Sequence, residues 1–560
     1  MQHTYLLTVL IFLPMAGVLA LLVLRSDDHE WIKRLALVTA VSEFVFSLLL
    51  LRGFDSANGT FQFQEFRDWI PSLGIHYHLG MDGISLFLVL LSTFLTPIAM
   101  LASWNSVHER VKAFFIALLV LETGMVGVFL SLDLFLFFLF WEAMLIPMYF
   151  LIGVWGHERR IYAAVKFILY TMFGSILMFV AIVWLAQLAH TFDVVAIQER
   201  LMTGQLALSS HTEMLLFGAF FLAFAIKVPM FPLHTWLPDA HTEAPTAGSI
   251  ILAGVLLKMG AYGMLRFCLP FFPDASRRFA PEIATLAIIG IIYGALVAMV
   301  QTDLKRLVAY SSVSHMGFIV LGIFALHPIS ENGAVFQMVS HGVTTGALFL
   351  AVGMLYDRRH TFAIREYGGL ATPMPVLAAF YLFICLASAG LPMLSGFVGE
   401  FLILIGTFVR HTSWASWAAL GVILSAVYLL WSYQRVFFGP VTLERNRSLA
   451  DASVRERGLL GVMAIVILAM GIGSTGFTRR IEPSVTYLLE SMQRPAVDAT
   501  ARPAPAAGSP VAAIVPAGAQ SAEAHFAIPR LAATDFVMTH FAAKQSAPAP
   551  ASIPARGAAD

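Results

Sequence analysis

Four ionisable residues lie deep inside apolar segments of the sequence, where a charge is costly. Glu142 stands in FLFWEAMLIP, Lys227 in FAIKVPMFP, Lys258 in VLLKMGAYG and Glu400 in SGFVGEFLIL. A charge at the bilayer centre costs roughly 2.5 to 3.5 kcal/mol on insertion scales, so such residues mark ion or proton pathways by default. Burial and a nearby opposite charge shift the proton affinity of a carboxylate or amine in opposite directions. We therefore predict that these four residues form a proton relay.

Structural roles are the alternative for each buried ionisable group. A buried Lys or Glu can form an ion pair that only holds two helices together, and this reading is weaker for four residues than for one. It stays open for Glu122 and Lys166. His315 and His341, taken alone, are more often hydrogen-bonded core histidines than ligands.

Sites for metals, nucleotides and redox centres are not predicted. The loop residues His234, Asp239, His241 and Glu243 superficially resemble a metal site, but they lack an established ligand spacing and lie among prolines. GIGSTG (471–476) matches G-x-G-x-x-G but ends an apolar segment and opens no helix, so nucleotide binding is rejected. There is no P-loop, CxxC pattern or haem attachment motif, and we expect no cofactor and no metal.

The elements that carry these residues are membrane spans. The chain is 59% hydrophobic and 12% charged, and its formal net charge of zero gives no basic field for nucleic acid. Windows of about 20 apolar residues predict an all-α polytopic membrane protein with about 14 transmembrane helices. The windows are 5–24, 31–51, 84–102, 111–130, 133–154, 161–188, 214–228, 245–267, 281–300, 304–324, 333–355, 376–408, 414–438 and 458–472.

Spans seven and twelve are predicted to be broken. Pro229 and Pro232 lack backbone donors, so the carbonyls of Ala225 and Val228 should lose their helical partners. Pro392 acts in the same way in span twelve, among three glycines. Since lipid cannot pair free backbone groups, each break must line protein or a water-filled cavity.

Loop composition and a weak repeat predict the organisation. Lys and Arg are more than twice as frequent in loops after odd-numbered spans, so both termini should face the outside. SLDLF (131–135) recurs as QTDLK (301–305), which fits an inverted repeat, although chance remains an alternative. An Asn58-Gly59 turn with TFQF and IHYH suggests a small external hairpin. The predicted parts are 1–110 with the hairpin, 111–267 and 281–438 as repeats, 458–481 as the last helix, and 482–560 as a disordered Ala/Pro-rich tail.

Four long motifs resemble one family. WEAMLIPMYFLIGVWG (141–156), FAIKVPMFPLHTWLPDAHTEAPTAGSIILAGVLLKMGAYG (224–263), DLKRLVAYSSVSHMG (303–317) and LPMLSGFVGEFLIL (391–404) are similar to the proton-translocating antiporter-like subunits of NADH:quinone oxidoreductase, respiratory complex I. Glu400, where L-type and N-type subunits usually have Lys, and the lack of a long amphipathic helix resemble the M-type branch. The tail after Glu482 departs from the family pattern.

The resemblance implies a role for each matched residue. Glu142 and Lys227 would form the charge pair of the first half, Lys258 the central relay and Glu400 the outer proton site. The expected supporting residues are Glu122, His234, His315 and His341. The family fold has two inverted five-helix repeats with broken helices 7 and 12. It implies L-type and N-type neighbours and a bacterial plasma membrane, with protons moved outward by electron transfer in other subunits.

Two rival functions remain. A cation/proton antiporter of the Mrp type shares the ancestry and most of the charges. A purely structural membrane scaffold is disfavoured because it needs no buried charge. Co-purification distinguishes the complex I subunit from the Mrp-type antiporter. Flavin and iron–sulfur subunits would accompany the former, and only small antiporter subunits the latter.

Overall fold

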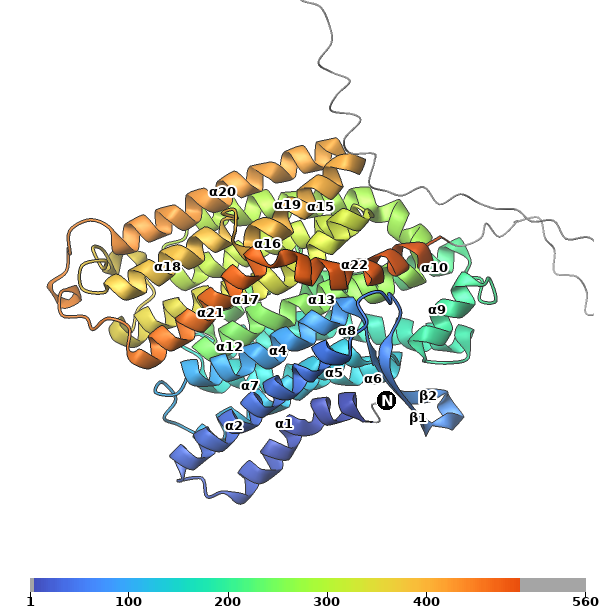
Figure 1. Cartoon of the computed structure of the whole chain (residues 1–560), viewed down its shortest axis with the longest axis horizontal. Coiled ribbons are helices and arrows are strands. Elements are labelled where there is room, and N and C mark those ends of the chain that lie inside the picture. Colours follow the sequence, from blue (N-terminus) through green and yellow to red (C-terminus); the bar gives the residue numbers. More distant parts are fainter. Residues whose placement is uncertain (1–4, 494–560) are drawn as a thin grey trace, which may run out of the picture. The chain divides into compact units, whose positions relative to one another are not determined.

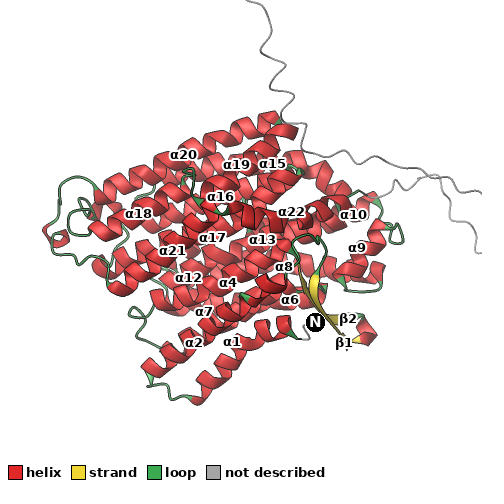
Figure 2. Cartoon of the chain, viewed as in Figure 1, coloured by secondary structure: helices red, strands yellow, loops and turns green. Residues whose placement is uncertain are grey.

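The computed structural model describes residues 5–493, and nearly all of the predicted apolar windows in this range are helical (Figures 1 and 2). The tail beyond residue 493 lies outside the described residues. The first helices are α1 (Leu6–Val23), α2 (His29–Ser47), α3 (Leu49–Gly53), α4 (Gly83–Ala102), α5 (Val111–Leu130), α6 (Leu134–Ala143), α7 (Leu145–Trp155), α8 (Arg160–Ala189), α9 (Val194–Met202), α10 (Ser210–Lys227) and α11 (Trp236–Glu243). The others are α12 (Thr246–Ile251), α13 (Leu257–Gly263), α14 (Leu269–Phe271), α15 (Pro273–Met299), α16 (Leu304–Phe324), α17 (Pro328–Arg359), α18 (Pro375–Ser388), α19 (Ser395–Arg410), α20 (Thr412–Phe437), α21 (Val454–Ile472) and α22 (Ser474–Ser491).

The number of spans is lower than the number of windows. Within residues 5–493, 12 helical segments are long and apolar enough to cross a membrane, or 13 if α21 and α22, bent by 67°, count as one. The remaining window forms α18 and α19, of 14 and 16 residues, which are each too short to count. The polytopic helical fold is confirmed.

Two predicted boundaries are wrong. α22 continues to Ser491, ten residues past the predicted end of the last helix. Its buried residues Ile481, Val485 and Leu488 recur at helical spacing, but the helix is amphipathic, so a window that averages hydropathy misses it. α15 begins at Pro273 instead of residue 281, because proline is well tolerated in the first turn of a helix.

A two-stranded hairpin joins α3 to α4. β1 (Gln62–Ile70) pairs antiparallel with β2 (Ile75–Met81), which confirms the predicted hairpin. The turn, however, is at Pro71–Leu73 and Gly74, and Asn58-Gly59 lies before β1. Gly74 has φ 68°, a left-handed conformation that glycine adopts without steric cost.

Backbone contacts repeat at the offset of 170 residues seen in the sequence. Asp133 caps α6, and its backbone forms an isolated antiparallel β-bridge with Asp193. In the same way, Asp303 caps α16 and forms a β-bridge with Ala363. Leu134 N donates to the carbonyl of Phe192 at 2.9 Å, and Leu304 N donates to the carbonyl of Phe362 at the same distance. These equivalent contacts support the repeat, whose inverted orientation stays a prediction.

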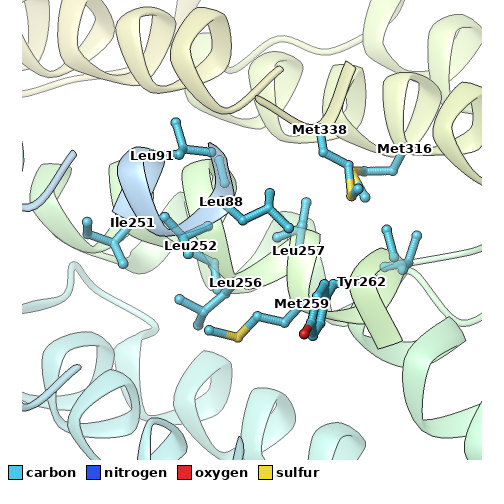
Figure 3. Packing of buried hydrophobic residues seen from close by; sticks show 14 of the residues in the cluster. Leu88, Leu91, Ile251, Leu252, Leu256, Leu257, Met259, Tyr262, Met316 and Met338 are labelled. Carbon is cyan, nitrogen blue, oxygen red and sulfur yellow. The ribbon is translucent and has the colours of Figure 1, made fainter. Parts of the chain in front are cut away.

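The core between the two predicted halves is formed by α4, α12, α13, α16 and α17. Figure 3 shows Leu88 and Leu91 of α4 near Leu252 of the π-helical segment Leu252–Leu256, and Met338 of α17 beside Met316 of α16. α17 approaches this segment at its backbone: a Cβ on Gly342 would lie 2.7 Å from the carbonyl oxygen of Gly254. This close packing fixes the positions of two nearby polar residues, His341 beside Gly342 and Lys258 one turn after Gly254.

Candidate proton-relay site

The predicted break in span seven is confirmed, and it places Lys227 at the end of α10. Lys227 is 1% exposed, and the next helix, α11, begins only at Trp236. The carbonyl of Ala225, expected to be free, accepts a hydrogen bond from Met230 N at 2.9 Å. Trp236 Nε1 donates to the carbonyl of Ile226 at 2.9 Å. The break therefore satisfies these carbonyls internally, as a low-polarity environment requires.

Lys227 does not form the expected direct ion pair with Glu142. Its Nζ has no hydrogen-bond partner among the described residues and lies 5.0 Å from the ring centroid of Trp141 and 5.8 Å from that of Phe167. Glu142 acts on it only as a nearby opposite charge. The ammonium is thus held by aromatic faces, a cation–π arrangement that strengthens where water is excluded.

Glu142 opens toward a groove between α6, α7 and α8. The groove has a volume of about 510 Å³ and is lined mainly by apolar residues such as Phe138, Leu139 and Met172. The Oε1 atom of Glu142 is shielded from solvent and has no hydrogen-bond partner within residues 5–493. Glu142 and Lys227 are therefore close enough to interact electrostatically but separated in this structure.

A row of buried polar side chains leads from Lys258, at the centre, to Glu400 in the second half, with a ring contact instead of a hydrogen bond between its two histidines. Lys258 Nζ donates to Nδ1 of His341 at 2.7 Å and also to the carbonyl of Ala253 in the π-helical segment. The rings of His341 and His315 have centroids 5.6 Å apart. His315 Nδ1 donates to Glu400 Oε1 at 2.9 Å. Lys258, the two histidines and Glu400 are at most 3% exposed, so the row is buried along its length.

The predicted break in span twelve is confirmed between α18 and α19, and Glu400 lies in the second turn of α19. Gln337 Nε2 donates to Glu400 Oε1 at 3.2 Å. Gly390 has φ 80°, and a Cβ there would lie 3.2 Å from Glu400 Oε2, so glycine leaves space for the carboxylate. Tyr428 OH lies 3.2 Å from His315 Nε2, which gives the imidazole a second partner.

The other supporting residues have different surroundings. Glu122 is fully buried, and its ionisable neighbour is the equally buried Glu43 of α2, which sequence reasoning missed. His234 stacks on Phe231, with centroids 5.8 Å apart, and neither of its ring nitrogens has a hydrogen-bond partner among the described residues. Within residues 5–493 no hydrogen bond or ring contact joins Glu122 or His234 to the row from Lys258 to Glu400, so their supporting roles stay predictions.

The residues considered for a metal site have other partners. Asp239 accepts a hydrogen bond from Lys166 Nζ at 2.7 Å, and Glu243 accepts from Arg159 N at 2.8 Å. Within residues 5–493 no group of three His, Cys, Asp or Glu could hold a metal ion. Lys166 thus forms an ion pair with Asp239, which fits the structural role that the sequence left open for it.

His241 is a candidate site residue that sequence reasoning considered only as a metal ligand. It is fully buried, stacks on Phe349 with centroids 4.6 Å apart, and interacts electrostatically with both Lys258 and Lys305. A buried imidazole between two lysines can carry a proton from one to the other. The sequence signal was the histidine within the DAHTEAP motif, eleven residues before the start of the π-helical segment at Leu252.

A polar cluster lies where α7, α11, α16 and α17 end or begin. His157 N donates to the carbonyl of Glu243 at 2.9 Å, and the His157 ring contacts Tyr356 OH at 3.2 Å. Lys305 Nζ donates to the carbonyl of Ala244, next to the C-terminus of α11. Burial, assisted by the nearby Lys305 charge, lowers the pKa of His157 to about 4, so this imidazole is neutral near pH 7.

Two family models match the chain. Residues 131–427 match the NADH:quinone oxidoreductase/Mrp antiporter transmembrane family, and residues 8–127 match the amino terminus of NADH-ubiquinone oxidoreductase chain 4. The NADH-quinone oxidoreductase subunit M of Rhodobacter capsulatus is 48% identical over 87% of this chain and 96% of its own length. The subunit M of Rickettsia bellii is 43% identical over 86% and 98%.

Solved structures agree with this match. A chain of respiratory complex I from Thermus thermophilus superposes with a TM-score of 0.79 at 31% identity, covering 87% of this chain and all of that one. A chain of the Mrp complex from Dietzia has a TM-score of 0.76 at 19% identity, covering 87% and 99%, and shares the fold. The resemblance expected from the motifs is confirmed, and the chain belongs to the NADH:quinone oxidoreductase/Mrp antiporter transmembrane family.

Proposed function

We propose that this chain is the M-type proton-translocating membrane subunit of an NADH:quinone oxidoreductase, and that Glu142, Lys227, Lys258 and Glu400 carry the protons. The observation that carries the proposal is the buried chain of contacts from Lys258 through His341 and His315 to Glu400. Each member can bind and release a proton, and burial excludes water that would otherwise dissipate the gradient.

The relay works because a proton moves between groups whose charges influence one another. A proton that arrives at His341 weakens the protonation of Lys258, since two adjacent buried cations repel. Transfer to His315 and then to Glu400 neutralises the carboxylate and lets the next proton enter. In the first half, separation of Lys227 from Glu142 would let a proton move on, because the buried ammonium then has no carboxylate to stabilise its charge.

Within this proposal, the chain itself holds no redox centre, and electron transfer takes place in other subunits. L-type and N-type subunits would be its membrane neighbours. The chain would lie in the bacterial plasma membrane with both termini outside, and protons would move from the cytoplasm outward. The bias of Lys and Arg toward loops after odd-numbered spans supports this orientation.

An Mrp-type antiporter is the second candidate, because the Mrp chain has the same fold. The 48% identity over 96% of a subunit M favours complex I. Purification of the chain with an affinity tag from mild detergent separates the two. Co-migration with flavin-containing and iron–sulfur subunits and with NADH oxidation supports the proposal, whereas co-migration with small antiporter subunits alone refutes it.

A further inference from the structure

A cavity lined by both charged and apolar residues lies at the end of the bundle where the arginine-rich loops meet. Its volume is about 670 Å³, and it is lined by Asp303, Arg365, Tyr367 and Arg435 among others. Three segments form it: the start of α16, the connection between α17 and α18, and the last turn of α20. None of its lining residues belongs to the proton relay.

The walls of the cavity are held together by backbone hydrogen bonds. Ile364 N donates to the carbonyl of Thr302 at 2.8 Å, which joins the first two segments. Gly369 N donates to the carbonyl of Phe438 at 3.1 Å, which joins the second segment to the end of α20. The cavity is therefore a preformed site, and ligand binding needs little reordering of the chain.

Two arginines of the cavity are unpaired. Within residues 5–493 neither Arg365 nor Arg435 takes part in an ion pair, although the neighbouring Arg359 and Arg445 both contact Glu366. The Nε and Nη2 atoms of Arg435 are shielded from solvent and have no hydrogen-bond partner. A shielded guanidinium with free donors is costly unless an anion satisfies it.

Asp303 is the only acidic residue among the cavity-lining residues, and its carboxylate is already engaged. Its Oδ1 accepts a hydrogen bond from Arg306 N at 2.7 Å as the cap of α16. The two arginines thus leave a net positive site. Guanidinium groups bind phosphate oxygens with paired, charge-assisted hydrogen bonds.

The apolar surroundings indicate that the anion is attached to a lipid. Arg435 stacks over Trp431, with its Cζ atom 4.3 Å from the ring centroid, and Trp431 is 43% exposed. Phe438, one turn further, is 57% exposed. Aromatic side chains of this kind gather at the membrane–water interface, and basic pockets between spans on the cytoplasmic side bind anionic head groups.

We propose that the cavity between α16, the α17–α18 connection and α20 binds the phosphate of an anionic phospholipid through Arg365 and Arg435. The acyl chains would lie along the exposed apolar side of α20. The site would be distinct from the relay, so its loss should weaken lipid binding without removing a proton-carrying group.

The purified complex is placed in nanodiscs of zwitterionic phosphatidylcholine and titrated with phosphatidylglycerol. Native mass spectrometry counts the bound phosphatidylglycerol. The double variant Arg365→Gln/Arg435→Gln should weaken one class of bound phosphatidylglycerol about thirtyfold, since each basic residue contributes about fivefold at a membrane surface. Arg447→Gln is the control, because Arg447 lies in the same arginine-rich region but pairs with Glu444 at 3.2 Å. It should leave the affinity unchanged.

Alternative ligands give different results. If the double variant does not assemble, each single variant should weaken the same class about fivefold. Unchanged lipid affinity in all of these variants overturns the proposal. So does inorganic phosphate that binds to, or competes for, the site, because the ligand is then a free anion. Loss of a neighbouring subunit from the variant complex, with lipid binding intact, would assign the cavity to a protein partner instead.

Discussion

Replacement of Glu400 by Gln removes the proton-carrying group at the end of the relay while it keeps the shape of the side chain. Glu400 is 3% exposed, and its Oε1 accepts hydrogen bonds from His315 at 2.9 Å and Gln337 at 3.2 Å. An amide oxygen can accept both. The structural cost is then the difference between charge-assisted and neutral hydrogen bonds, about 1 kcal/mol for each bond.

The functional cost should be much larger. A positioned acid or base contributes typically about 10² to 10⁴-fold to a proton-transfer rate. Gln cannot bind and release a proton near neutral pH, so we expect proton pumping by Glu400→Gln to fall at least about a hundredfold. Acidification of inverted membrane vesicles, started with NADH, measures pumping, and native gel electrophoresis measures the amount of assembled complex.

Glu331→Gln is the matched control for this variant. Glu331 is fully buried in α17, and among the described residues its carboxylate oxygens have no hydrogen-bond partner, in the relay or elsewhere. The same substitution there should leave pumping within a few-fold of wild type. Wild-type pumping in assembled Glu400→Gln, or an equal loss in both variants, would refute the assignment of Glu400.

Three further predictions test other parts of the reasoning. Lys227→Arg should abolish pumping in the assembled complex, because arginine keeps the charge but does not release its proton; full pumping would favour a structural role. His157, with a folded pKa of about 4 against about 6.5 unfolded, stabilises the fold fully above pH 6.5, and this stability is lost as the pH falls toward 4. His157→Gln should therefore reduce the drop in thermal midpoint between neutral pH and about pH 5, and an unchanged drop contradicts this cause. A reporter fused after Arg359 should be cytoplasmic and one at Arg277 external, and opposite labelling would reverse the orientation.

Local signals in the sequence identify the spans, their breaks and the buried charges. A proline removes a backbone donor wherever it stands, so the interruptions after Lys227 and before Glu400 could be predicted from neighbouring residues alone. The same holds for Asp133 and Asp303, whose type and position before an apolar run predict a helix cap.

Contacts between distant segments could not be predicted in this way. Lys258 and His341 are 83 residues apart, and their hydrogen bond depends on the close approach of α17 to the π-helical segment. No local pattern contains that approach. Glu43 stands inside the predicted apolar window 31–51, so the rule that selected Glu142 would also have found it. Its position beside Glu122 could not be predicted, because the two residues are on different helices.

The two halves of the site differ in how their charges are satisfied. At the centre and in the second half, Lys258 and Glu400 each have a direct hydrogen-bond partner, whereas in the first half Lys227 Nζ has none among the described residues. An unpaired buried ammonium is costly, and in this arrangement no contact with a carboxylate offsets that cost for Lys227. A direct contact with Glu142 would offset it. We therefore expect that a side-chain movement that brings the two groups into contact switches the first half between releasing and holding a proton, which is the property that the Lys227→Arg variant removes.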